Sequence, residues 1–162
     1  PQVDTPEIAR SVVDAAYYAP LGSRGMAVNG PHNDFLAATS LDELNAQVHI
    51  TVMLESREAF GHLDEIVATP GIDAVTLGPA DLAQDLGVRG TPDEAEVVDE
   101  HRLRLIDSAH RHGKAVAMLF GTVEEARPWV EAGVRILAIS SDVAVLQNGY
   151  RDIVRGLRPE VT

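Results

Sequence analysis

The chain has 162 residues, 45% of them hydrophobic, which is enough for a buried core, and we expect residues 1–162 to form a single domain. Its 13 basic and 25 acidic residues give a net charge of −12, which disfavours binding to nucleic acid and to anionic membrane surfaces. Cysteine is absent, which excludes disulfides and thiolate sites, and no apolar run approaches the ~20 residues that span a bilayer. This composition favours a cytoplasmic protein.

Helices are predicted from their N-terminal signals. The first lies within 5–18, where Thr5 is a candidate N-cap and Pro6 suits the first helical position. Three later segments begin with Ser or Thr and have Glu three residues further on, which is the capping-box pattern. These predicted helices are 40–47, 91–113 and 122–133.

Short apolar runs lie between the predicted helices. They are apolar nearly throughout, which is typical of strands buried on both faces of a parallel sheet. The runs are 48–54, 73–77, 115–120 and 135–140. Gly71, Gly113 and Gly133 stand between a helix and a strand, where a residue with positive φ can end the helix. The order predicts βαβ units, in which ligands bind beyond the carboxyl ends of the strands.

Two acids follow neighbouring predicted strands. Glu55 comes directly after the first run, and Asp81 follows the second in the stretch Gly78-Pro79-Ala80-Asp81. Adjacent parallel strands lie about 4.8 Å apart, so the two carboxylates would repel each other unless a proton or a cation intervened. Mg²⁺ typically takes one or two carboxylates, and small residues allow backbone N–H groups to approach an anion. We interpret the stretch as a metal and anion site; the alternative is that Gly-Pro only interrupts regular structure.

At these residues the chain resembles a known family. The stretch "VMLESREAFGHLDEIVATPGIDAVTLGPADLAQDLG" is similar to the HpcH/HpaI aldolases, metal-dependent class II enzymes of the phosphoenolpyruvate/pyruvate barrel superfamily. The likeness extends upstream through "PQVDTPEIARSVVDAAYYAPLGSRGMA" and downstream through "GKAVAMLF" to "ILAISSDVAVL". It implies an α/β fold, the (β/α)8 TIM barrel. Since that barrel needs about 250 residues and "PQV" matches the end of its fourth strand, we expect an incomplete barrel lacking about the first three βα units.

The resemblance also implies roles for particular residues. Glu55 and Asp81 match the family's ligands for a divalent metal ion, Mg²⁺ or Mn²⁺ with Co²⁺ as an alternative. Residues 78–80 match the loop whose backbone receives the pyruvate carboxylate, and Leu119 matches an apolar residue beside the pyruvate methyl group. The implied reaction is cleavage of a 4-hydroxy-2-oxo acid, a small pyruvate-type substrate, into pyruvate and an aldehyde.

The chain departs from the family in two respects. Met53 stands where many members have Gln, so a substrate hydrogen bond from that position is not expected. The family's His–Asp pair and Arg, which serve acid–base chemistry and stabilise the enolate, have no counterpart, so no catalytic residue is assigned. Among the residues present, His32 is the one histidine that we place near a site, and Arg24 either touches substrate or forms a tight turn.

Two alternative functions stay open from the sequence. One is a citrate-lyase-like enzyme that acts on an acyl-CoA; the other is a non-catalytic protein that binds a metal, a 2-oxo acid or a partner chain. A barrel without its first strands would leave an unpaired strand edge and an uncovered apolar face. We therefore expect a homo-oligomer, a complementing chain or poor solubility.

Overall fold

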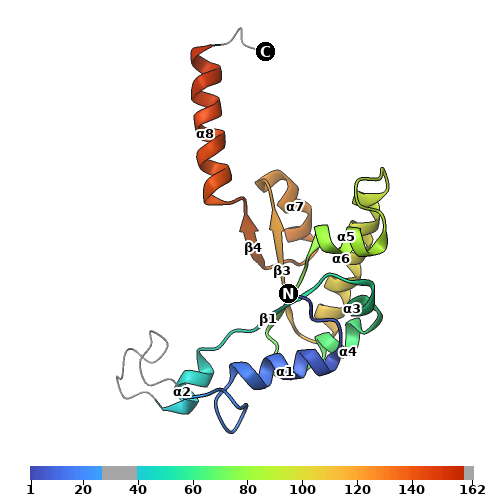
Figure 1. Cartoon of the computed structure of the whole chain (residues 1–162), viewed down its shortest axis with the longest axis vertical. Helices are drawn as coiled ribbons and strands as arrows, with labels where there is room; N and C mark the ends of the chain where they lie inside the picture. Colours follow the sequence, from blue (N-terminus) through green and yellow to red (C-terminus); the bar gives the residue numbers. More distant parts are fainter. Residues whose placement is uncertain (27–39, 159–162) are drawn as a thin grey trace.

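The computed structural model of the chain describes residues 1–26 and 40–158. Four of the elements form one parallel sheet in the order β1-β2-β3-β4 (Figure 1). The described elements are α1 (Pro6–Ala16), α2 (Leu41–Ala46), β1 (Thr51–Leu54), α3 (Arg57–Gly61), α4 (Leu63–Val67), β2 (Ala74–Leu77), α5 (Pro79–Leu86), α6 (Glu94–Arg111), β3 (Ala115–Phe120), α7 (Val123–Glu131), β4 (Ile136–Ile139) and α8 (Asp142–Leu157).

All four predicted strands are confirmed, and all pair in parallel. Each strand neighbours the next one in the sequence, which is the order of a barrel; a doubly wound sheet reverses its order at one point. The first strand is shorter than predicted. Its first paired residue is Thr51, which pairs with Ala74, the first residue of β2. Residues 48–50 therefore precede the paired part of the strand.

The glycine predictions are confirmed by backbone geometry. Gly71, Gly113 and Gly133 each lie a few residues after a helix and have φ of 89°, 67° and 115°. A residue with a Cβ is disfavoured in this region, so each glycine lets the chain leave its helix and enter the next strand.

Two of the three predicted capping boxes lie at helix starts. At α2 the Ser40 hydroxyl accepts the Glu43 N–H, and the Glu43 carboxylate accepts the Ser40 N–H, so the box is complete. At α7 the Thr122 hydroxyl accepts the Glu125 N–H, but the Glu125 carboxylate accepts the Gly121 N–H in place of that of Thr122. The local pattern therefore locates both helix starts.

The third predicted capping box is wrong. Helix α6 begins at Glu94, and Thr91 lies before it with its hydroxyl donating to the carbonyl of Val88. The Glu94 carboxylate accepts the Gly90 N–H at 2.6 Å and pairs with Arg89. These bonds stabilise a turn at 88–91 and shift the helix start by two residues, from an N-cap at Thr91 to one at Asp93.

Helices α3 to α7 cover one face of the sheet, while the other face is open (Figure 1). Along β3 the side chains alternate, with Val116, Met118 and Phe120 buried in the core and Leu119 59% exposed. Every residue of β4 is exposed. The open face is the one that the missing strands of a closed barrel would cover.

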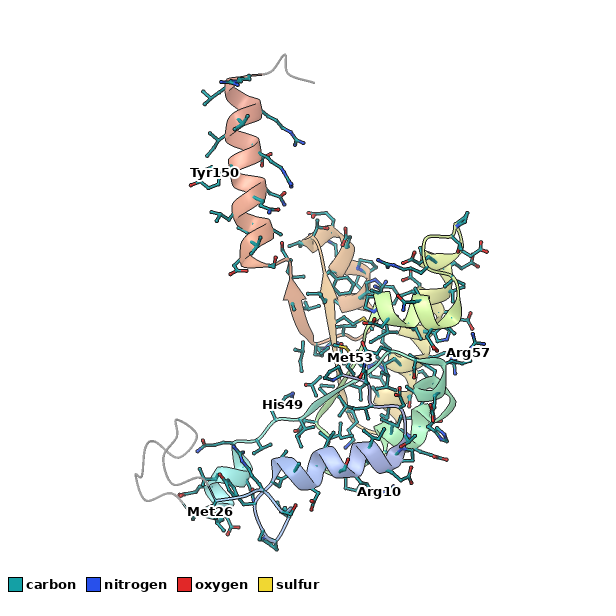
Figure 2. The ribbon with its side chains drawn as sticks, viewed as in Figure 1. Arg10, Met26, His49, Met53, Arg57 and Tyr150 are labelled. Carbon is teal, nitrogen blue, oxygen red and sulfur yellow. The ribbon has the colours of Figure 1, made fainter. Side chains whose placement is uncertain are left out.

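Helix α8 extends away from the sheet (Figure 1), and none of its residues is buried. Its apolar side chains recur at helical spacing, and Tyr150, 64% exposed, projects from the helix away from the rest of the chain (Figure 2). Among the described residues, no helix is both long and apolar enough to cross a membrane.

Candidate functional site

Glu55 lies directly after β1, at the carboxyl edge of the sheet, and is only 7% exposed. Its Oε1 accepts a hydrogen bond from the backbone N–H of Gln2 at 2.8 Å. A buried carboxylate requires hydrogen bonds or a counter-charge, and this backbone donor provides one of them. The bond also holds one oxygen of Glu55 in a defined position.

Gly78 lies next to the second oxygen of the same carboxylate. Its N–H donates to the carbonyl of Leu54 at 3.2 Å, so it continues the pairing of β2 with β1. A Cβ at Gly78 would stand 2.1 Å from Oε2 of Glu55 and 2.9 Å from its Cβ. Since φ is an ordinary −89°, glycine is required here for space rather than for backbone conformation. The neighbour that the small size of Gly78 accommodates in the structure is Glu55.

Replacing Gly78 with Ala should therefore disturb Glu55 and weaken Mn²⁺ binding about three- to tenfold, which corresponds to roughly 1 kcal/mol. Isothermal titration of Mn²⁺ measures the effect, with circular dichroism to verify folding. Gly61→Ala is the control, since a Cβ there meets no atom within 4 Å. Equal Mn²⁺ affinities for both variants would contradict the proposal that Gly78 keeps Glu55 in position for a metal ion.

Asp81 lies in the first turn of α5 and is exposed. The sequence predicted a loop at 78–80; this is wrong, because Pro79 is the first residue of the helix and Gly78 its N-cap. Proline suits this position because it has no N–H to satisfy and its φ is already helical. The N–H of Leu82 donates to the carbonyl of Gly78. The N–H groups of Ala80 and Asp81 donate to no acceptor within the described residues.

The start of α5 thus offers two backbone donors, the N–H groups of Ala80 and Asp81, next to the carboxylate of Asp81. The N-terminus of a helix favours negative charge, both through its unpaired N–H groups and through the helix dipole. Asp81 itself profits from that field, and an anion that reaches the Ala80 and Asp81 N–H groups would profit as well. The arrangement can hold a cation on its carboxylates and an anion on its amides.

The carboxylates fit a hard cation that keeps most of its positions for other oxygens. Glu55 and Asp81 follow the neighbouring strands β1 and β2, and each supplies oxygen donors of the kind that Mg²⁺ prefers. Across residues 1–26 and 40–158, no group of three or more His, Asp or Glu side chains could hold a metal ion. From the described part of the chain, a cation at this edge would therefore take no more than two carboxylates, with other oxygens such as water or substrate completing its shell.

Leu119 lies near the end of β3, on the open face of the sheet. Its side chain lines a cavity of about 780 Å³ together with Gly121 and Ser140. Neither Glu55 nor Asp81 lines this cavity. The structure therefore places Leu119 at the same edge of the sheet as the acids without bringing the three side chains into one hollow.

Arg24 was the other described residue considered from the sequence. Arg24 lies over the ring of Tyr18 at 5.0 Å, its Nη1 donates to the carbonyl of Ala16 at 3.4 Å, and its backbone N–H donates to the carbonyl of Tyr17. Its described contacts are therefore with the end of α1 and the residues just after it, and it lies outside the turn at 19–21. His32 lies outside the described residues.

Sequence reasoning missed an acid whose role is structural. Asp64 of α4 accepts the Ser108 hydroxyl and both Nη atoms of Arg111 at 2.9 and 3.1 Å, which ties α4 to α6. The hydrogen bond from Ser108, followed by that from Arg111, lowers the pKa of Asp64. Because these partners lie 44 and 47 residues away, no local pattern identifies them.

Known proteins resemble the chain in sequence and in structure. The family model for HpcH/HpaI aldolase/citrate lyase matches residues 1–149. A hydroxypyruvate/pyruvate aldolase of Chromohalobacter salexigens is 33% identical over 158 residues, covering 95% of this chain and 61% of the relative. A 5-keto-4-deoxy-D-glucarate aldolase of Escherichia coli is 32% identical over 154 residues, covering 94% of this chain and 60% of the relative.

The structural comparison agrees. A crystal structure of an HpcH/HpaI aldolase from Desulfitobacterium hafniense superimposes with a TM-score of 0.87 at 31% identity, covering 99% of this chain and 62% of that one. The chain therefore spans about three fifths of the length of the proteins it matches. Its four parallel strands form part of an incomplete (β/α)8 barrel.

Proposed function

Since the chain belongs to the HpcH/HpaI aldolase/citrate lyase family, we propose that it carries the metal- and pyruvate-binding part of an aldolase. The proposed reaction is cleavage of a 4-hydroxy-2-oxo acid to pyruvate and an aldehyde. The observation that supports it most directly is the placement of Glu55, held by the Gln2 N–H and packed against Gly78, beside the start of α5. Aldolase names among relatives of more than 30% identity point to the same reaction class.

Each residue of the site has a role in this proposal. Glu55 and Asp81 hold a divalent cation, Mg²⁺ or Mn²⁺ with Co²⁺ as an alternative. When bound, such a cation supplies Lewis acidity that stabilises negative charge on the substrate's 2-oxo oxygen. The N–H groups of Ala80 and Asp81 bind the pyruvate carboxylate, Pro79 starts the helix that aims them, and Leu119 contacts the methyl group. We assign no general base.

Metal-dependent anion binding tests the proposal. Oxalate, a stable analogue of the pyruvate enolate, should bind the Mn²⁺-saturated chain at least about tenfold more tightly than the metal-free chain, because unneutralised carboxylates at the site repel an anion. Isothermal titration with and without Mn²⁺ measures the difference. Equal oxalate binding under both conditions would point to another pocket and contradict the proposed site.

The citrate-lyase-like alternative belongs to the same family description, but the relatives of more than 30% identity are named aldolases. A non-catalytic binding protein is the alternative of another class. Mn²⁺-dependent oxalate binding distinguishes such a binding protein from a chain that binds neither metal nor anion. An activity assay distinguishes it from an enzyme. We keep the cytoplasmic location and the single domain over 1–162 as proposals.

We further propose that the chain associates with another copy of itself. All residues of β4 and the large apolar side chains of α8 are exposed, including Leu146, Tyr150 and Leu157 at 62%, 64% and 78%. Apolar surface of this extent favours burial against another polypeptide. Light scattering on the purified chain should therefore give a mass of at least two copies or show aggregation. A well-behaved monomer at dilute concentration would contradict this expectation.

A further inference from the structure

The segment before α1 lies along the free edge of β1. Its Val3 N–H donates to the carbonyl of Met53 at 3.2 Å, and the Gln2 N–H reaches Oε1 of Glu55 at 2.8 Å. Strand β2 pairs with β1 on its other side, so β1 lies between β2 and this segment. Glu55 follows β1 and therefore has backbone on both sides. Gln2 is therefore a direct neighbour of the proposed metal ligand.

Gln2 lies off the core that its neighbour helps to form. Val3 is 3% exposed and belongs to the same buried cluster as Val52 and Leu54. Gln2 itself is not part of that cluster. Gln2 is exposed, and its carboxamide makes no hydrogen bond within the described residues. A neutral donor and acceptor is thus available on a residue whose backbone contacts Glu55.

The backbone of Gln2 has a conformation that its residue type disfavours. Its φ is 56°, in the left-handed region, which is uncommon for residues with a Cβ and costs glycine nothing. Glycine would present the same N–H to Glu55 without this strain. Residues held in disfavoured conformations tend to occur where the side chain or its exact placement has a function.

We propose that the carboxamide of Gln2 binds substrate, donating a hydrogen bond to an oxygen of the 2-oxo acid held between Glu55 and the start of α5. This inference rests on the proposed function. A carboxamide suits the position because its NH₂ group donates to a carboxylate or oxo oxygen without bringing a charge that competes with the cation. The backbone N–H of the same residue meanwhile keeps Glu55 in place.

Two substitutions test the role of the side chain. Gln2→Gly removes the carboxamide, keeps the N–H to Glu55 and suits the left-handed backbone. Gln2→Met keeps most of the length of the side chain and removes only its hydrogen-bonding capacity. Both variants should bind Mn²⁺ within about twofold of the unaltered chain, whereas their Mn²⁺-loaded forms should bind oxalate about tenfold more weakly, the scale of one lost hydrogen bond to a charged group.

Thermal unfolding of the metal-free chain gives an independent readout. Gln2→Gly should raise Tm by about 2–4 °C, since it relieves the left-handed strain. A purely structural role for Gln2 predicts the reverse, a lower Tm with unchanged oxalate affinity, and that result would overturn the inference. Failure of the proposed function would look different, because the unaltered chain would then show no Mn²⁺-dependent oxalate binding at all.

Discussion

The 162-residue chain alone should bind Mn²⁺ and yet release pyruvate from a 4-hydroxy-2-oxo acid barely above the rate with free metal ions. The carboxyl edge of the described sheet offers carboxylates and backbone N–H groups, but we assign no residue there as a base. Retro-aldol cleavage requires removal of the 4-hydroxyl proton, and loss of a positioned base typically costs 10²–10⁴-fold in rate. We expect the rate of pyruvate release by this chain to be about 10²–10⁴-fold lower than that of an aldolase with a positioned base.

The comparator is a longer protein that restores the usual barrel length of about 250 residues. Its added upstream part is taken from the Chromohalobacter salexigens aldolase, which is 33% identical in the region that matches this chain. Pyruvate release, coupled to lactate dehydrogenase with Mg²⁺ or Mn²⁺ present, compares the two proteins, and the longer one should be active. Robust turnover by the short chain would reveal an unassigned base, with His32 examined first. Inactivity of both would favour the binding-protein alternative.

The second large effect is expected at the carboxylates. Glu55→Gln or Asp81→Asn should each weaken Mn²⁺ binding at least about tenfold, and the double variant about 100-fold, because each removes one charged oxygen ligand. Glutamine at position 55 retains an oxygen that can accept the Gln2 N–H, so the change addresses the charge rather than the packing. Isothermal titration with Mn²⁺ measures both variants.

Glu100→Gln serves as the matched control. Glu100 is exposed on α6, so its removal changes the net charge by the same amount at a distance from the carboxyl edge. Its Mn²⁺ isotherm should equal that of the unaltered chain. Unchanged isotherms for the Glu55 and Asp81 variants would remove the proposed metal site, whereas a weakened isotherm for Glu100→Gln would attribute the effect to overall charge.

Several local features were predictable because neighbouring residues decide them. The four apolar runs became parallel strands, and Gly71, Gly113 and Gly133 have positive φ where each chain segment turns from a helix towards a strand. The box at Ser40 needed only Glu43, three residues away. The same reasoning failed at Thr91, because hydrogen bonds of Glu94 to the preceding turn compete with the capping box.

Apolar runs and turn residues act over a few positions, so the strands, their parallel pairing and the acids that follow them could be predicted from local sequence. The way in which Glu55 is held depends instead on contacts between distant segments. The Gln2 N–H reaches Glu55 from 53 residues away, and Gly78 leaves the space that the Glu55 carboxylate fills. Such contacts exist only once β1 and β2 are paired and the first segment lies beside them, because that assembly brings distant backbone within hydrogen-bonding distance.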